Sequence, residues 1–162
     1  MKHLDEYRKF IPTRYILLGF LVGLFINMIP SGGLLPDVVA LLILYWLIIN
    51  PEQINLGTTF ILGLVMDVAT FSLLGQHALA YTITSYIVLR HWRKISLYNY
   101  GTQTLVALGI LLLNHVIISL IGYLYSGKPP TLESFFPVLI GALSWPLLNK
   151  LMIFIYRPRS NR

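Results

Sequence analysis

Residues 101–125, GTQTLVALGILLLNHVIISLIGYLY, decide the fold class of this chain. The stretch contains no Asp, Glu, Lys or Arg, and it exceeds the roughly 20 apolar residues with which a helix crosses the hydrocarbon core of a bilayer. A single open strand cannot take the place of a helix there, because its backbone N–H and C=O groups would be unpaired in lipid. The sequence therefore predicts a membrane-spanning helix over 101–125.

The composition of the whole chain agrees with this segment. Of 162 residues, 56% are hydrophobic and 11% are charged, whereas a soluble domain carries roughly 25% charged residues. Six acidic and twelve basic residues are too few to cover a globule of this size, which excludes an ordinary soluble enzyme and a disordered chain. The absence of cysteine excludes disulfides and thiolate chemistry. We expect an all-α polytopic membrane protein, with one membrane domain over 1–162.

Pro/Gly clusters and charged residues divide the chain into six apolar segments. They predict six transmembrane helices at about 15–29, 37–49, 56–74, 77–89, 101–125 and 135–156, preceded by a cytosolic or interfacial N-terminus at 1–13 and followed by a cytosolic tail at 157–162. The second and fourth segments are short for a full crossing. Four spans with two re-entrant segments are therefore the alternative.

Basic residues gather at three places along the chain and predict its orientation. They lie at the N-terminus, between the fourth and fifth segments, and in the tail: Lys2, Arg8, Lys9 and Arg14; Arg90, Arg93 and Lys94; Arg157, Arg159 and Arg162. The positive-inside rule puts all three places in the cytoplasm, which six crossings allow. We expect a multi-pass membrane protein with both termini cytoplasmic. Basic residues beside spans favour anionic lipid over nucleic acid as a partner.

Asp67 is the intramembrane carboxylate of the sequence. It lies 11 residues after Leu56, or about 16 Å along a helix. A charge near the bilayer centre costs roughly 2.5–3.5 kcal/mol, so Asp67 should face the bundle interior and have a partner. One interpretation is an ion or proton site, and the other is a structural clamp between helices. The candidate partners are Asn114, His115, Tyr81 and Ser85.

Asn114 and His115 lie about 20 Å along the fifth segment, close in depth to Asp67. They either pair with Asp67 or make separate interhelical hydrogen bonds, worth about 0.6 kcal/mol each. Asp37 follows a proline and suits the N-terminus of a helix, where a carboxylate meets the positive end of the dipole. Tyr45-Trp46 suits an aromatic belt at the cytoplasmic interface.

Other local patterns predict packing and lipid contact. Gly19 and Gly23 form a GxxxG pattern that we expect to serve internal packing. Leu4, Tyr7, Phe10 and Ile11 have the spacing of a short interfacial helix, and an irregular tail is the alternative. The sequence contains no zinc-ligand spacing, no phosphate-binding glycine loop and no Ser-His-Asp pattern. We therefore expect no catalytic, cofactor-binding or metal site.

Several short motifs, taken in order, resemble one known family. The chain resembles the rod shape-determining protein MreD family through Pro36-Asp37, Leu44-Tyr45-Trp46, Pro51, Gly57, Gly63-Leu64 with Asp67, Leu74-Gly75, Ala78-Leu79 and, near the C-terminus, Trp145-Pro146. The resemblance covers nearly the whole chain and is densest from Pro36 to Tyr86.

The resemblance implies a non-enzymatic inner-membrane subunit of the bacterial cell-elongation (rod) complex. Such proteins accompany the bitopic protein MreC and, through it, MreB filaments, RodA and a penicillin-binding transpeptidase in peptidoglycan synthesis. Their fold is similar to that of the substrate-binding subunits of energy-coupling-factor vitamin transporters. The resemblance therefore leaves two candidate functions: a scaffold that maintains cell shape, and a membrane-embedded subunit for uptake of a small, vitamin-like solute. The scarcity of intramembrane polar residues favours the scaffold.

Overall fold

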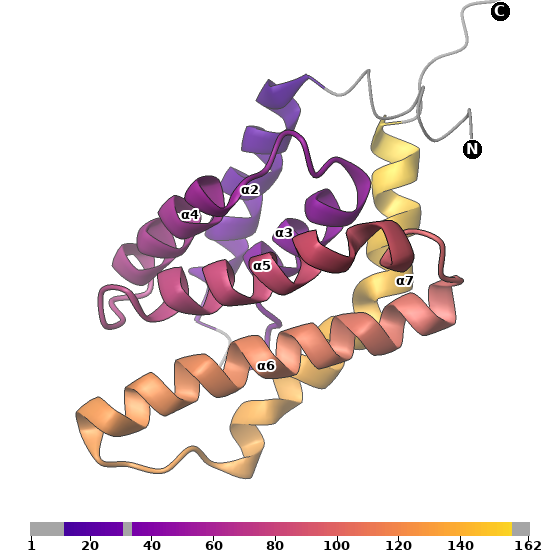
Figure 1. The fold of residues 1–162 in the computed structure, drawn as a ribbon. Helices are drawn as coiled ribbons and strands as arrows, with labels where there is room; N and C mark the ends of the chain where they lie inside the picture. The colour runs from indigo at the N-terminus through magenta and orange to yellow at the C-terminus, as the bar shows by residue number, and fades with distance from the viewer. Residues whose placement is uncertain (1–11, 31–33, 157–162) are drawn as a thin grey trace, which may run out of the picture.

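The computed structural model describes residues 12–30 and 34–156, and this part of the chain is helical without strands. The helices are α2 (Thr13–Asn27), α3 (Val38–Ile49), α4 (Leu56–Ala69), α5 (Gln76–Ile95), α6 (Tyr100–Ser126) and α7 (Phe136–Tyr156), with a 3-10 turn η1 (Leu132–Phe135) before α7 (Figure 1). The predicted all-α class is confirmed. The interfacial helix expected around Leu4–Ile11 falls outside the described residues.

Helix α3 forms the centre of the molecule. It contacts α2, α5, α6 and α7, and ten of its residues, from Val39 to Ile48, are buried. A helix enclosed on every side needs no polar face, which explains its uninterrupted apolar sequence. Tyr45 and Trp46 are 1% and 0% exposed, with ring centroids 5.2 Å apart in an edge-to-face arrangement. The predicted aromatic belt is therefore wrong, because the neighbouring helices cover both rings.

Helices α4 and α5 form an antiparallel hairpin (Figure 1). A Cβ atom on Gly63 would overlap the backbone of Ala78, so only glycine permits this approach. The predicted helix 56–74 is too long, since α4 ends at Ala69. The chain reverses there through left-handed backbone at Phe71, with φ of 54°, and at Gly75, with φ of 97°.

Helix α5 is longer than the predicted 77–89 and ends at Ile95. Its last turn contains Arg93 and Lys94, which are good helix formers and carry positive charge near the negative end of the helix dipole. The basic cluster is therefore the end of a helix rather than a connection between two helices.

A set of side-chain hydrogen bonds ties the α5–α6 turn to α7. Gln103 donates from Nε2 to the carbonyl oxygens of Ile95 at 3.3 Å and Tyr98 at 3.1 Å. Its Oε1 accepts from Nε1 of Trp145 at 3.4 Å. Pro146, the next residue, lies inside α7, and the helix bends along its course (Figure 1), as expected where a proline removes a backbone hydrogen bond.

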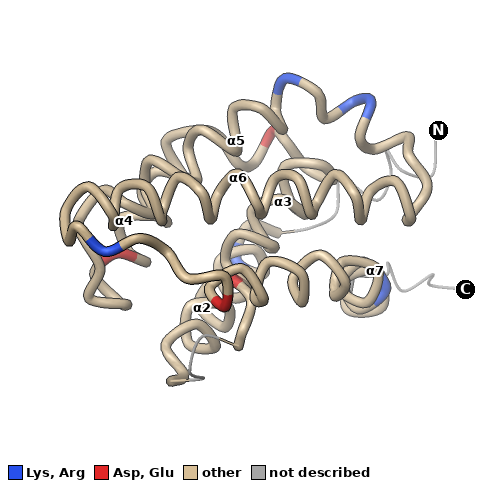
Figure 2. The backbone as a smooth tube through the Cα atoms, turned by 90° about the horizontal axis from the view of Figure 1, so that it is seen from below, with Lys and Arg blue, Asp and Glu red and all other residues tan. Residues whose placement is uncertain are grey.

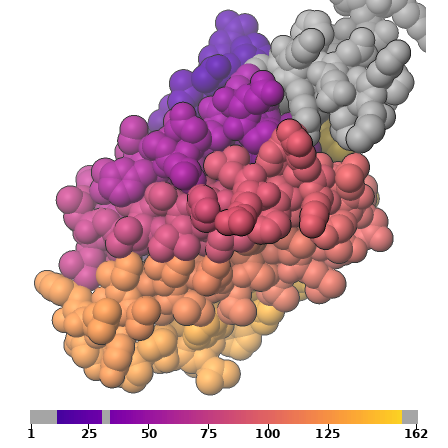
Figure 3. All heavy atoms as spheres, viewed as in Figure 1, coloured from indigo at the N-terminus to yellow at the C-terminus, as the bar shows by residue number. Residues whose placement is uncertain are grey.

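The outer surface of α2, α6 and α7 is largely apolar. Two segments, Tyr100–Ser126 and Leu132–Ile155, are long and apolar enough to cross a membrane. Figure 2 shows long stretches of helix without a charged position, and Figure 3 shows α4, α5 and α6 packed side by side on one face. Large hydrophobic side chains are exposed on α2, α6 and α7, among them Leu17, Leu21, Phe25, Leu105, Leu124, Leu143 and Leu147.

Candidate functional site

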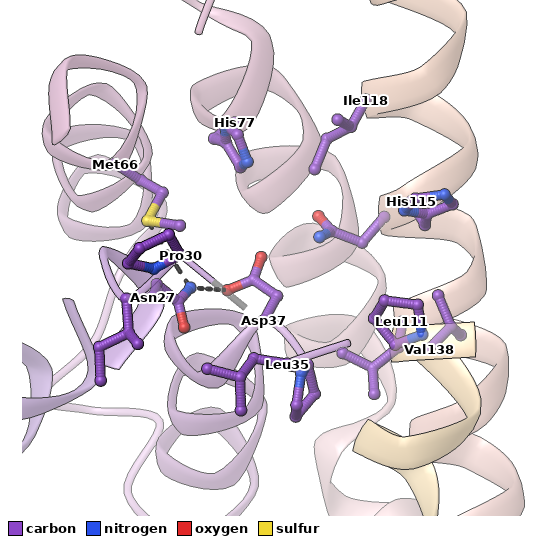
Figure 4. A pocket seen from close by; sticks show the side chains of 14 residues that line it. Asn27, Pro30, Leu35, Asp37, Met66, His77, Leu111, His115, Ile118 and Val138 are labelled. Carbon is purple, nitrogen blue, oxygen red and sulfur yellow. Dashed lines mark hydrogen bonds between the residues drawn. The ribbon is translucent and has the colours of Figure 1, made fainter. Parts of the chain in front are cut away.

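A pocket of about 460 Å³ lies where the α2–α3 connection meets α4, α5, α6 and the start of α7. Figure 4 shows Asp37 in its centre, with Asn27 and Met66 on one side and Leu111 and Val138 on the other. Its lining combines a few polar side chains with apolar walls, as ligand sites do. The lining residues are Asn27, Ile29, Pro30, Leu35, Pro36, Asp37, Met66, His77, Leu111, Asn114, His115, Ile118, Pro137 and Val138.

Asp37 joins three helices at this pocket. As the N-cap of α3, its Oδ1 accepts from the backbone N–H of Ala40 at 2.9 Å, which confirms the predicted cap. The same oxygen accepts from Nδ2 of Asn27 on α2 at 2.9 Å, and Oδ2 accepts from the hydroxyl of Tyr81 on α5 at 2.7 Å. All three partners are neutral donors, so the carboxylate acts only as an acceptor, as its ionised form does.

Asn27 and Tyr81 are the site residues whose link to Asp37 was not predicted. Asn27 closes a second contact, because its Oδ1 accepts from the backbone N–H of Val38 at 3.0 Å. The sequence contains one signal for this pair: Asn27 ends one helix and lies ten residues before Asp37, the carboxylate that caps the next helix. Tyr81 is 44 residues from Asp37 in sequence, and only the packing of α5 against α3 brings the two together.

Asp67 lies in the last turn of α4 and is fully buried. Its Oδ1 accepts from the hydroxyl of Ser72 at 3.0 Å and from the backbone N–H of His77 at 2.8 Å, and Oδ2 accepts from the backbone N–H of Gly75 at 2.8 Å. The carboxylate thus caps the start of α5 from the end of α4. This arrangement is a structural clamp of the α4–α5 turn.

The predicted partners of Asp67 are wrong. None of Asn114, His115, Tyr81 and Ser85 shares a hydrogen bond with it among the described residues. The physical reason is the end of α4 two residues after Asp67, which lets the chain fold back over the carboxylate. Donors in the α4–α5 turn and in the first turn of α5 then satisfy the carboxylate, and it needs no partner deeper in the bundle.

His77 contacts both the clamp and the pocket. Its Nδ1 lies 2.8 Å from Oδ1 of Asp67, and because a carboxylate only accepts, we assign the ring hydrogen to Nδ1. In the neutral imidazole, Nε2 is then an acceptor. Ser72 Oγ lies 3.3 Å from the same Nδ1. Serine and aspartate thus meet one ring nitrogen, whereas a catalytic triad needs them on opposite nitrogens.

Asn114 and His115 both line the pocket. Asn114 is 4% exposed, and its Oδ1 has no hydrogen-bond partner in the described part of the chain. His115 lies 3.3 Å from the hydroxyl of Ser134 through Nε2 and packs edge-on against Phe135, with centroids 4.8 Å apart. The structure therefore brings these two residues to Asp37 rather than to Asp67.

The other motif residues lie in separate places. Pro36 and Asp37 belong to the pocket, Gly63, Asp67, Leu74 and Gly75 to the α4–α5 hairpin, Tyr45 and Trp46 to the core, Pro51 to the α3–α4 turn, and Trp145 and Pro146 to α7. Within the described ranges, no group of three or more His, Asp or Glu side chains could hold a metal ion. Most of the motif therefore positions helices, and its Pro36-Asp37 part also forms the pocket.

The fold and site define an all-helical protein with an apolar exterior and a polar pocket between its helices, a class typical of membranes. The chain belongs to the rod shape-determining protein MreD family, whose model matches residues 6–155. This is a family of membrane proteins with a role in cell shape, and it is not a known enzyme family.

The comparison with a curated relative agrees with the family. The chain is 33% identical over 98 residues to a rod shape-determining protein MreD of Haemophilus influenzae. The match covers 56% of this chain and 60% of the relative, so it spans less than two thirds of the relative's length. No solved structure matches.

Proposed function

We propose that this protein is a non-enzymatic inner-membrane subunit of the bacterial cell-elongation complex, which scaffolds an MreC-type bitopic protein and thereby peptidoglycan synthesis. MreB filaments, RodA and a penicillin-binding transpeptidase are then indirect partners. Membership of a cell-shape family supports the setting.

The observation that carries the proposal is the apolar exterior of α6. This helix has 27 residues, of which the buried ones are Gln103, Ala107, Leu111 and Asn114. Its outward side is available to lipid and to the single helix of a bitopic partner. Van der Waals packing, rather than charge, drives helix association in a bilayer. Such a surface is suited to holding another membrane protein.

Photo-crosslinking tests the scaffold. A photoreactive amino acid at exposed positions of α6 (Leu105, Leu112, Val116) and of α7 (Leu147, Leu151) should give an adduct with an MreC-type protein from at least one helix. The same probe at buried Ala107 is the matched control and should give none. Absence of the adduct at every exposed position, with unchanged expression, contradicts the proposal.

The proposed topology is six crossings with both termini cytoplasmic. Helix α3, at about 18 Å, is shorter than the roughly 30 Å hydrocarbon core, and its enclosure by other helices allows irregular backbone at its ends. Single cysteines replacing Ser31 and Ser126 should react with a periplasmic thiol reagent, and one replacing Ser160 should not. The reverse pattern of labelling would overturn the orientation.

The pocket favours a second candidate, a membrane-embedded subunit that binds a small, vitamin-like solute for uptake. Its volume of about 460 Å³ lies within the roughly 300–1,000 Å³ of small-molecule sites. Likeness to the substrate-binding subunits of energy-coupling-factor transporters remains a prediction. Failure to capture an MreC-type partner, combined with a melting temperature raised by a vitamin-like solute, would favour this candidate over the scaffold.

A further inference from the structure

We infer that the pocket binds a primary ammonium group attached to a small apolar moiety, with Asp37 as its counter-ion. The inference goes beyond the scaffold and does not depend on it, because it concerns binding by the isolated chain. It rests on the charge of the pocket, on one unused acceptor and on its apolar walls.

The charge of the pocket is negative. Asp37 receives hydrogen bonds only from neutral groups, Asn27, Ala40 and Tyr81, which stabilise the carboxylate without neutralising it. None of the 14 lining residues is Lys or Arg. The Asp37 carboxylate is partly exposed at the pocket, where a group of opposite charge could form a charge-assisted hydrogen bond with it. A cation in the pocket would supply that charge, and an anion would be repelled.

One buried polar atom of the pocket lining is an unused acceptor. Oδ1 of Asn114 has no partner in the described structure, although the side chain is 4% exposed, and a buried acceptor of this kind strongly favours a donor. An ammonium group has three donors and no acceptor, which complements the Asp37 carboxylate and Oδ1 of Asn114.

The walls of the pocket determine which group can be attached to the ammonium. Met66, Leu111, Ile118 and Val138 give the pocket apolar sides. They suit a short alkyl chain, whose burial adds to binding in proportion to its area. A soluble alkylamine and the ethanolamine headgroup of a phospholipid both present a primary ammonium group beside an apolar chain. Their shared chemistry is what the pocket recognises.

The test uses the full chain, purified in a non-ionic detergent, and n-hexylamine as the probe. We expect hexylamine to raise the melting temperature of the protein. Two control compounds should raise it much less: 1-hexanol, which lacks the charge, and hexyltrimethylammonium, which lacks N–H donors. Equal shifts from hexylamine and hexanol, or no shift from hexylamine, would overturn the inference.

Variants locate the binding. Asp37→Asn removes the charge but keeps a residue that caps helices well, and it should weaken hexylamine binding by about tenfold or more. Asn114→Leu removes the free acceptor at similar volume and should weaken binding by about threefold or more. Glu133→Gln is the matched control, because it removes one carboxylate outside the lining.

The two single variants keep the inference testable if one of them does not fold. Wild-type affinity in Asn114→Leu, or the same affinity in Asp37→Asn and Glu133→Gln, contradicts it. Vesicles then distinguish the source of the ammonium group. Weaker hexylamine binding in phosphatidylethanolamine than in phosphatidylcholine vesicles indicates the lipid headgroup, and equal binding indicates a free amine; either result supports ammonium recognition.

Discussion

Asp37 and Asp67 lie in two regions in which a carboxylate at a helix end obtains its hydrogen-bond donors in different ways. Both carboxylates lie at helix ends and act only as acceptors. The partners of Asp67 lie within ten residues of it in the chain, and the side chain is sealed from solvent. The partners of Asp37 come from α2, α3 and α5, and the carboxylate borders a pocket.

The difference separates a local role from a global one. A carboxylate satisfied by its own turn fixes one hairpin and has no capacity left for a ligand. A carboxylate satisfied by three elements fixes their relative positions, and it retains a side on which another molecule can bind. The following changes test this distinction, beginning with the largest expected effect.

Asp67→Ala should be the most destabilising of these changes. It leaves the backbone N–H groups of Gly75 and His77, which are partly buried, without acceptors, at about 1–3 kcal/mol for each group. Thermal unfolding in detergent should show a loss of about 2–6 kcal/mol in the free energy of unfolding, the sum for the two groups. Asp67→Asn is the conservative comparison and should lose less. A loss in Asp67→Ala no larger than in Asp37→Ala would remove the contrast between the two regions.

Gly63→Ala tests the close packing of the same hairpin. The added methyl group meets the backbone of Ala78, which cannot move as a flexible side chain would. We expect a loss of about 1–3 kcal/mol in the free energy of unfolding, measured in the same way. Gly109→Ala is the matched control, since nothing lies within 4 Å of its added Cβ, and it should not destabilise.

Tyr81→Phe tests the Asp37 region with a smaller change. It removes the 2.7 Å hydrogen bond to the carboxylate while Asn27 and Ala40 still donate. The free energy of unfolding should fall by about 1.5 kcal/mol, the lower end for a hydrogen bond to a charged group. Tyr86→Phe changes an exposed ring and is the control. Equal melting temperatures of the two variants would show that the α3–α5 link contributes nothing to stability.

Phe71→Gly should have the smallest effect on the free energy of unfolding, and it should raise this free energy rather than lower it. Phe71 has a φ of 54° and is 95% exposed, so its ring gains little while its backbone is strained. Glycine adopts this conformation freely, and relief of the strain should raise stability by about 1 kcal/mol. Leu132→Gly, at another exposed hydrophobic residue, should give no such gain. A lowered melting temperature for Phe71→Gly would indicate that the ring holds the turn.

The sequence predicts the helices because each apolar block must satisfy its backbone internally. It also predicts the Asp37 cap, since a capping residue acts on atoms three residues away. The partners of Asp67 escaped prediction because the left-handed conformation of Phe71 ends α4 early. The pocket escaped it as well, since Asn27, His77 and Asn114 converge only through tertiary packing. For the same reason Tyr45 and Trp46 lie in the core.

The enclosed position of α3 has a consequence for biosynthesis. The chain is made from its N-terminus, so in the proposed six-crossing topology α3 enters the membrane before α5, α6 and α7, which later cover it. A helix with a polar face would be unstable in lipid during that interval. The sequence VVALLILYWLII has no such face, and it is compatible first with acyl chains and then with side chains. Its uniform apolarity therefore serves the order in which the protein is assembled as well as its final core.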